Sequence, residues 1–146
     1  MEVVTFTCTK EDFAGSFDSR VTEFDAWENY DLLNEFFGAH DASLMCSKEE
    51  YFDGFDTSTW TDYVIIEDGA IVSRAAIWKR SDDVWEVAGV STRPDRRSEG
   101  YGAAVVKSCI AKIVENDKTA ACTTRPNNIA MINTALQAGF IRNQHI

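Results

Sequence analysis

Residues 97–102, Arg97-Ser-Glu-Gly100-Tyr-Gly102, combine basic charge with two closely spaced glycines between a β-rich stretch and an apolar helical pattern. The N-terminus of a helix exposes unpaired N–H groups and carries a partial positive charge. Glycine lets the backbone approach a ligand without a Cβ in the way. The pattern therefore predicts an anion cradle, and the length of the loop favours a pyrophosphate, with Arg96 and Arg97 adding charge.

Two familiar phosphate-binding loops do not fit this stretch. The P-loop of kinases and ATPases needs a Lys-Ser/Thr pair after its last glycine, and none follows Gly102. A dinucleotide-binding fold needs a third glycine where this chain has Val105, in a parallel setting that the preceding strands do not offer. A G-x-G triplet alone arises by chance about once in a chain of this size, so the surrounding elements must decide.

The elements around the glycine turn predict a mixed α+β sheet with helices on its faces. Asp68-Gly69 is a hairpin signal between two strands, and Asn128 and Gly139 have the positions of a helix cap and a helix stop. In chain order we predict a strand over residues 2–8, one broken or two consecutive helices up to about residue 37, three antiparallel strands within residues 61–92, a helix over about residues 100–115, a strand over residues 119–124 and a helix over residues 128–139.

The stretch after the first strand carries helical signals. They are a capping box at Thr9 and Asp12, apolar residues Phe17, Val21 and Phe24 at helical spacing, an end of the pattern at Gly38, and a second capping box at Ser47 and Glu50. We therefore expect residues 12–37 to be mainly helical, and a short further helix to begin after Ser47.

This order of elements and motifs resembles the GNAT acyltransferase superfamily. Its central signature, R/Q-x-x-G-x-G/A between the fourth strand and the third helix, matches residues 97–102. Its second signature, N-x-x-A-x-x-x-Y-x-x-x-G-F, is partly present from Asn128 to Phe140. The resemblance is specific from about Tyr63 to Phe140 and only topological before it. It implies one α+β domain over residues 1–146, with a mixed, mainly antiparallel sheet flanked by helices and a shortened C-terminal end.

The resemblance implies an acetyl-CoA-dependent N-acetyltransferase that lets an amine attack the thioester directly in a ternary complex. A backbone N–H near Val90 would polarise the thioester carbonyl. The residues that match the family's acetyl-CoA site are Val90, Thr92, Arg97, Ser98, Gly100, Tyr101, Gly102, Ala103 and Asn128. The alternative is a non-catalytic, acyl-CoA-binding regulatory module that uses the same loop.

Glu86 is the predicted general base. A lysine-like amine has a pKa near 10.4 and is almost fully protonated at neutral pH, so a base that removes its proton speeds the reaction. Because side chains alternate along a strand, Glu86 would share a face with Val90 and Thr92. The histone-acetylating branch of the family also keeps its base at this distance before the glycine turn. A water relay between Glu86 and the amine is expected, because the separation along the strand is about 13 Å.

The general acid of the family, a tyrosine in the last helix, has no counterpart here. The matching position is Ala135. Tyr101 and Tyr63 are the candidates to replace it, although Tyr101 lies in the phosphate loop. If neither serves, the thiolate of coenzyme A leaves without a proton from a tyrosine.

Charge is unevenly distributed along the chain. Residues 1–60 contain 14 acidic and three basic side chains, a net charge of −11, whereas residues 61–146 contain 10 and 11, a net charge of +1. An acidic half disfavours nucleic acids and anionic membranes as partners. Together with the aromatic residues of the same half, it suits a cationic amine, which could be a polyamine, an aminoglycoside-like compound, or a lysine or N-terminal amine of a peptide.

The cysteines, the first residues and the residues after the last helix predict the metal content, the compartment and the assembly of the protein. The cysteines, Cys8, Cys46, Cys109 and Cys122, are predicted to be reduced thiols, and without C-x-x-C spacing no metal site is expected. The first residues lack the features of a signal peptide and no apolar run could span a bilayer, so a cytoplasmic protein is expected. Family members add two strands after the last helix, so we expect a homodimer that covers the open sheet edge, or an unusually open acceptor site.

Overall fold

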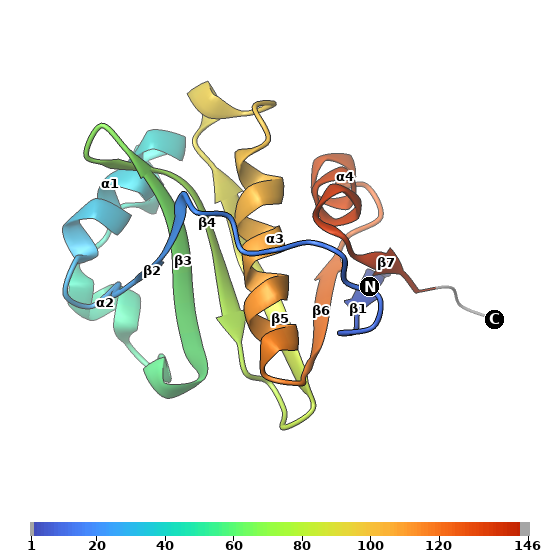
Figure 1. Ribbon diagram of the computed structural model, residues 1–146. Coiled ribbons are helices and arrows are strands. Elements are labelled where there is room, and N and C mark those ends of the chain that lie inside the picture. Colours follow the sequence, from blue (N-terminus) through green and yellow to red (C-terminus); the bar gives the residue numbers. More distant parts are fainter. Residues whose placement is uncertain (1, 144–146) are drawn as a thin grey trace.

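The computed structural model describes residues 2–143, which form one twisted sheet with helices on both faces (Figure 1). The sheet has the order β2-β3-β4-β5-β6-β1-β7, and only β5 and β6 run parallel. The strands are β1 (Val4–Cys8), β2 (Val21–Phe24), β3 (Trp60–Glu67), β4 (Ala70–Trp78), β5 (Val84–Thr92), β6 (Thr119–Thr124) and β7 (Ile141–Arg142). The α-helices are α1 (Tyr30–His40), α2 (Lys48–Phe52), α3 (Tyr101–Glu115) and α4 (Ile129–Ala138), joined by the short 3-10 helices η1 (Ala42–Leu44), η2 (Thr57–Thr59) and η3 (Pro94–Arg96).

Each face of the sheet has its own apolar core. Under α3, Ile110 packs with Val87 of β5 and with residues of β1, β3, β4 and β6. On the opposite face, Leu33 of α1 packs with Val64 of β3. A strand covered on both faces is apolar at nearly every position rather than at alternate positions, and β4 is buried from Ile71 to Ile77 in this way.

The predicted α+β fold is confirmed, and the second half of the chain follows the sequence closely. Asp68 and Gly69 both have left-handed φ angles, 53° and 77°, as a two-residue hairpin turn requires. The Oδ1 atom of Asn128 caps α4 by accepting a hydrogen bond from the backbone N–H of Met131, at 3.2 Å. Gly139 ends α4 with a φ of 116°. The second capping box is also confirmed, with Ser47 accepting from the backbone N–H at residue 50.

The predicted helix over residues 12–37 is wrong in its first part. Val21–Phe24 form β2, an edge strand antiparallel to β3. Val21 points into the core under α3 and Phe24 into the core under α1. A separation of three residues suits one face of a helix, and it also suits the two faces of a strand that is covered on both sides. The capping box at Thr9 closes a single turn, with the N–H of Phe13 bonded to the carbonyl of Thr9 at 3.0 Å. The real helix α1 continues past Gly38 to His40.

An open sheet edge was expected after the last strands of the chain. In the structure the N-terminal strand β1 covers the edge of β6. β1 lies between β6 and β7 and is antiparallel to both, with Phe6 opposite Cys122 on one side and Arg142 on the other. In Figure 1 the two ends of the described chain meet at this edge. The homodimer stays a prediction, and its sheet edge would be that of β7. Within the described residues β7 spans Ile141 and Arg142.

The remaining sequence expectations concern the cysteines and membrane-spanning segments. All four cysteines have free thiols, and three of them, Cys8, Cys109 and Cys122, are buried. Within residues 2–143, no helix has the length and apolar character that a membrane span requires.

Candidate active site

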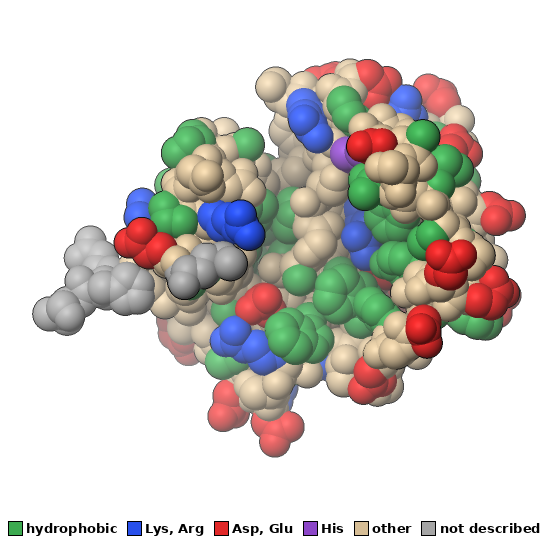
Figure 2. Space-filling view, turned by 180° about the vertical axis from the view of Figure 1, so that it is seen from behind, with side chains coloured by type: hydrophobic (Ala, Val, Ile, Leu, Met, Phe, Trp, Pro, Cys, Tyr) green, Lys and Arg blue, Asp and Glu red, His purple; other side chains and the backbone are tan. Residues whose placement is uncertain are grey.

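β5 and β6 are paired at one end and separate at the other. Residues 84–86 pair with residues 119–121, and no pairing follows beyond Glu86. The diverging ends enclose a cleft of about 800 Å³, whose walls are β5, β6, the loop before α3, the first turn of α3 and one side of α4. Figure 2 shows the molecule hollowed between a smaller lobe and a larger one, and in Figure 1 the strands β6, β1 and β7 with α4 lie on one side of this division.

A bulge in β5 shapes one wall of the cleft. The register between β4 and β5 shifts at this point, so that Gly89 and Val90 have no partner on β4. Gly89 has a left-handed φ of 61°. A β-bulge takes backbone groups out of the hydrogen-bond ladder and reverses the alternation of side chains beyond it. The backbone of Val90 therefore lies at the cleft wall outside the regular ladder.

The prediction that Glu86 shares a face with Val90 and Thr92 is wrong because of this bulge. Val87 belongs to the core under α3, and Val90, three residues later, packs on the same core. Glu86 therefore lies on the opposite face, toward α1 and α2. Its Oε1 accepts a hydrogen bond from Nη1 of Arg80 at 2.9 Å, its side chain is 16% exposed, and it is not one of the residues that line the cleft.

The loop before α3 has the conformation of an anion cradle. Ser98 and Gly100 have left-handed φ angles of 66° and 83°. A Cβ atom on Gly102 would lie 3.4 Å from Oγ1 of Thr92, which is an ordinary contact, so α3 begins beside the end of β5. The first turn of α3 contains no acidic side chain that would compete for its free N–H groups. Backbone donors and a helix N-terminus are thus directed at one end of the cleft.

The two arginines of the loop have different surroundings. Arg96 forms a salt bridge with Glu67, and its Nη2 also donates to the hydroxyl of Tyr101 at 2.6 Å. The hydrogen bond from Tyr101, and then the Arg96 guanidinium, hold the pKa of Glu67 below its ordinary value. Arg97 is exposed, and its Nε donates to the carbonyl of Thr92 at 3.3 Å. Within residues 2–143 Arg97 has no carboxylate partner, so its charge is available to a ligand.

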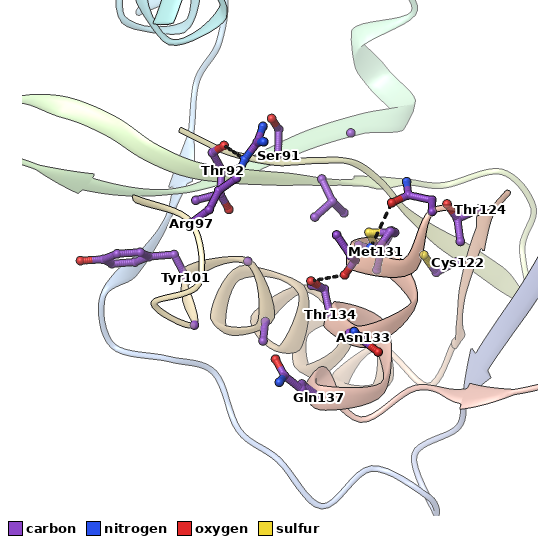
Figure 3. A pocket seen from close by; sticks show the side chains of 18 of the residues that line it. Ser91, Thr92, Arg97, Tyr101, Cys122, Thr124, Met131, Asn133, Thr134 and Gln137 are labelled. Atoms are coloured by element: carbon purple, nitrogen blue, oxygen red, sulfur yellow. Dashed lines mark hydrogen bonds between the residues drawn. The ribbon is translucent and has the colours of Figure 1, made fainter. Parts of the chain in front are cut away.

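The structure brings the predicted acetyl-CoA residues together at one cleft. All nine line it, namely Val90, Thr92, Arg97, Ser98, Gly100, Tyr101, Gly102, Ala103 and Asn128. Figure 3 shows the ring of Tyr101 directed away from the labelled side chains of α4, so Tyr101 meets the cleft mainly through its backbone. That these residues hold acetyl-CoA stays a prediction.

None of the three positions considered for a general acid offers a hydroxyl to the cleft. Tyr63 is buried in the core under α3, where its hydroxyl donates to Glu23 at 3.5 Å. The hydroxyl of Tyr101 donates to Glu67 at 2.8 Å. Ala135 is fully buried against the same core. Burial raises the pKa of Tyr63, and the hydrogen bond to Glu67 raises that of Tyr101.

Several residues of the cleft were missed by the sequence reasoning. They include Cys122, Met131, Thr134 and Gln137, all labelled in Figure 3. Three of them follow Asn128 at intervals of three residues, so helical spacing from the predicted cap could have found them. Cys122 was expected in the core, and burial does raise the pKa of its thiol to about 12, which keeps it protonated at neutral pH.

Aromatic side chains surround a buried ion pair on the face toward α1 and α2. Nη2 of Arg74 lies 2.7 Å from Oδ1 of Asp62, with both side chains less than a tenth exposed, and also donates to the hydroxyl of Tyr51 at 3.2 Å. The rings of Phe55 and Trp60 meet edge to face, 5.3 Å apart. Figure 2 shows acidic side chains spread over the larger lobe around hydrophobic ones.

A profile of the acetyltransferase (GNAT) family matches residues 26–140, and the chain belongs to this family. A putative acetyltransferase of the GNAT family from Novosphingobium aromaticivorans superposes with a TM-score of 0.69 at 17% identity, over 99% of this chain and 62% of its own. The ribosomal-protein-S18-alanine N-acetyltransferase of Escherichia coli superposes with a TM-score of 0.64 at 16% identity, over 85% of this chain and 78% of its own. An aminoglycoside 6′-N-acetyltransferase complexed with coenzyme A superposes with a TM-score of 0.53 at 16% identity, over 66% of this chain and 56% of its own.

At these identities the solved structures share the fold with this chain. The chain spans less than two thirds of the Novosphingobium protein. No curated protein matches the sequence.

Proposed function

We propose that the chain transfers an acetyl group from acetyl-CoA to a primary amine of a cationic small molecule or peptide. The observation that carries this proposal is the meeting, at one cleft, of the glycine loop, the start of α3 and the unpaired edge of β5. A family member with this arrangement has what acyl transfer needs, which is an anchor for the cofactor and a donor for the thioester oxygen.

Acetyl-CoA is assigned along the length of the cleft. The backbone N–H groups from Arg97 to Ala103 would bind the pyrophosphate, and the free guanidinium of Arg97 would add charge. The pantetheine arm would follow Val90 and Thr92 along the edge of β5 that β6 leaves unpaired. The amide N–H₂ of Asn128 would donate from the other wall, because its Oδ1 is used to cap α4.

A preplaced backbone donor would stabilise the transition state. When the amine nitrogen attacks the thioester carbon, negative charge develops on the carbonyl oxygen. The N–H of Val90, at the bulge, is assigned to this oxygen. The C–S bond then breaks, and the sulfur of coenzyme A leaves as a thiolate that takes its proton from water, since no tyrosine hydroxyl of the family's kind faces the cleft.

Glu86 is assigned as general base, through water. It lies on the face toward α1 and α2, which is the face from which an amine reaches the bulge without meeting coenzyme A. Its salt bridge with Arg80 uses one carboxylate oxygen and leaves the other for a water molecule. The acidic and aromatic character of this face supports a cationic acceptor.

The second candidate is a non-catalytic module that binds acyl-CoA. It is favoured by one observation, the engagement of Tyr101 and Tyr63 away from the cleft. Turnover separates the two candidates. Release of free thiol from acetyl-CoA would be followed with polyamines, aminoglycosides and basic peptides. Amine-dependent release establishes the enzyme, whereas tight acetyl-CoA binding with no release by any amine establishes the module.

A further inference from the structure

His40, the last residue of α1, bridges the helix to the cofactor end of β5. Its Nε2 lies 3.0 Å from the carbonyl oxygen of Thr92 and 2.8 Å from Oγ of Ser91. Its Nδ1 lies 2.8 Å from the carbonyl oxygen of Phe36, one turn back in α1. The ring also packs edge to face on Phe36, with centroids 4.7 Å apart. A histidine on the acceptor side of the sheet is thus bonded to the strand that faces acetyl-CoA in the proposed complex.

The Thr92 carbonyl is a junction of three segments. It belongs to β5 and lies 3.0 Å from Nε2 of His40, the last residue of α1. It also accepts a hydrogen bond from Nε of Arg97, in the loop before α3, at 3.3 Å. The hydroxyl of the same threonine bonds with Ser73 of β4 at 2.8 Å. A displacement of Thr92 would therefore move Arg97 and the place where α3 begins against Gly102.

The end of β5 is bonded to β4 on one side and to no strand on the other, and His40 adds a contact from the helix layer. Beyond the bulge only Ser91 and Thr92 are in register with β4, and β6 has already diverged. His40 is the side chain that reaches this end from the helix layer on the acceptor side.

We propose that His40 is a positioning residue that sets the cofactor loop. By donating from Nε2 to the Thr92 carbonyl, it holds Thr92 and, through Thr92, the guanidinium of Arg97 in the geometry that binds pyrophosphate. A carbonyl only accepts hydrogen bonds, so the contact with Thr92 is a hydrogen bond only when Nε2 carries a proton, and the contact of Nδ1 with the Phe36 carbonyl likewise needs a proton on Nδ1. The inference rests on the proposed function, since it concerns the binding of acetyl-CoA.

Two substitutions distinguish the contact made by Nε2 from the contact made by Nδ1. His40→Gln places an amide N–H₂ near the position of Nε2 and keeps a donor for the Thr92 carbonyl. His40→Asn is shorter, places its amide near Nδ1, and keeps only the local bond to the Phe36 carbonyl. Both variants lose the aromatic ring that packs on Phe36, so they control for each other in this respect. Acetyl-CoA affinity would be measured by calorimetry and Tm by thermal unfolding.

We expect His40→Gln to bind acetyl-CoA within a factor of about two of the wild type, and His40→Asn to bind about tenfold more weakly, as loss of one hydrogen bond to a fixed group predicts. Weaker binding by His40→Asn at a temperature well below the Tm of both variants, where both are fully folded, distinguishes positioning from a structural role. Equal affinities of the two variants, whether normal or weakened, would overturn the inference. A wild-type protein that does not bind acetyl-CoA would overturn the proposed function and, with it, the inference.

Discussion

Gly89 of β5 and Arg74 of β4 are in closest approach at the bulge, where a Cβ on Gly89 would lie 3.1 Å from Nη1 of Arg74. Trp60 lies behind the same point, 3.5 Å from that Cβ. The bulge at Gly89 and Val90 thus packs against the ion pair of Arg74 and Asp62. In the proposed function the Val90 backbone contacts the thioester and the ion pair lies on the acceptor side. This contact connects the two sides of the proposed reaction.

The contact predicts the effect of a single methyl group. Gly89→Ala should lower the free energy of unfolding by about 1–3 kcal/mol through its left-handed φ, and should lower kcat further by displacing the backbone of Val90. Gly54→Ala is the matched control, because Gly54 also has a left-handed φ, 71°, with nothing within 4 Å of an added Cβ. Denaturant unfolding and turnover would be compared for both. Equal turnover in the two variants would contradict the role of the bulge.

The ion pair itself predicts a large stability effect. Asp62→Ala leaves the guanidinium of Arg74 buried without its carboxylate, which should lower the free energy of unfolding by about 3–5 kcal/mol. Asp95→Ala removes the partner of Arg93 in a salt bridge whose carboxylate side chain is 61% exposed, and should change stability by less than about 1 kcal/mol. Urea unfolding measures both. Similar losses in the two variants would show that the buried pair has no special weight.

The free charge of Arg97 predicts a binding effect that depends on salt. Arg97→Ala should raise the Kd for acetyl-CoA about tenfold at low ionic strength and less at high ionic strength, since exposed charges are screened. Arg93→Ala is the control, because Arg93 is already paired with Asp95. Calorimetric titrations at two salt concentrations test this. A Kd that is unchanged in the Arg97 variant would remove this residue from the pyrophosphate site.

The assignment of Glu86 as base predicts a loss of rate without a loss of affinity. Glu86→Gln should lower kcat by about 10²- to 10⁴-fold and leave the Kd for acetyl-CoA unchanged. Arg80→Ala breaks the same salt bridge and keeps the carboxylate, so it should retain most of the activity. If the two variants lose activity equally, Glu86 acts through its salt bridge and another group removes the proton.

The glycine turn before α3 and the second half of the fold could be predicted from the sequence because their signals are local. The hairpin at Asp68 and Gly69, the cap at Asn128 and the stop at Gly139 each depend on residues close to them in the chain. The same holds for the glycine turn, in which Gly100 has a left-handed φ of 83°.

What could not be predicted depends on distant contacts. β1 pairs with β6, more than 100 residues later, and no local pattern indicates that it takes this place in the sheet. β2 has helix-like spacing because both of its faces are buried. The bulge at Gly89 reverses the side-chain alternation on which the orientation of Glu86 was predicted. Tyr101 was a candidate for the general acid, but its hydroxyl donates to Glu67 of β3, and no local pattern indicates this contact between residues 34 apart in the chain.

The central claim is that the glycine turn before α3 binds the pyrophosphate of acetyl-CoA. The most direct test is calorimetric titration of acetyl-CoA into the wild type, Gly102→Ala and Gly102→Trp, with each variant shown to be folded by circular dichroism. A Cβ at Gly102 makes only ordinary contacts, so the alanine variant should bind like the wild type, whereas the indole should fill the cradle and abolish binding. Equal binding by all three proteins, or no binding by the wild type, would contradict the account.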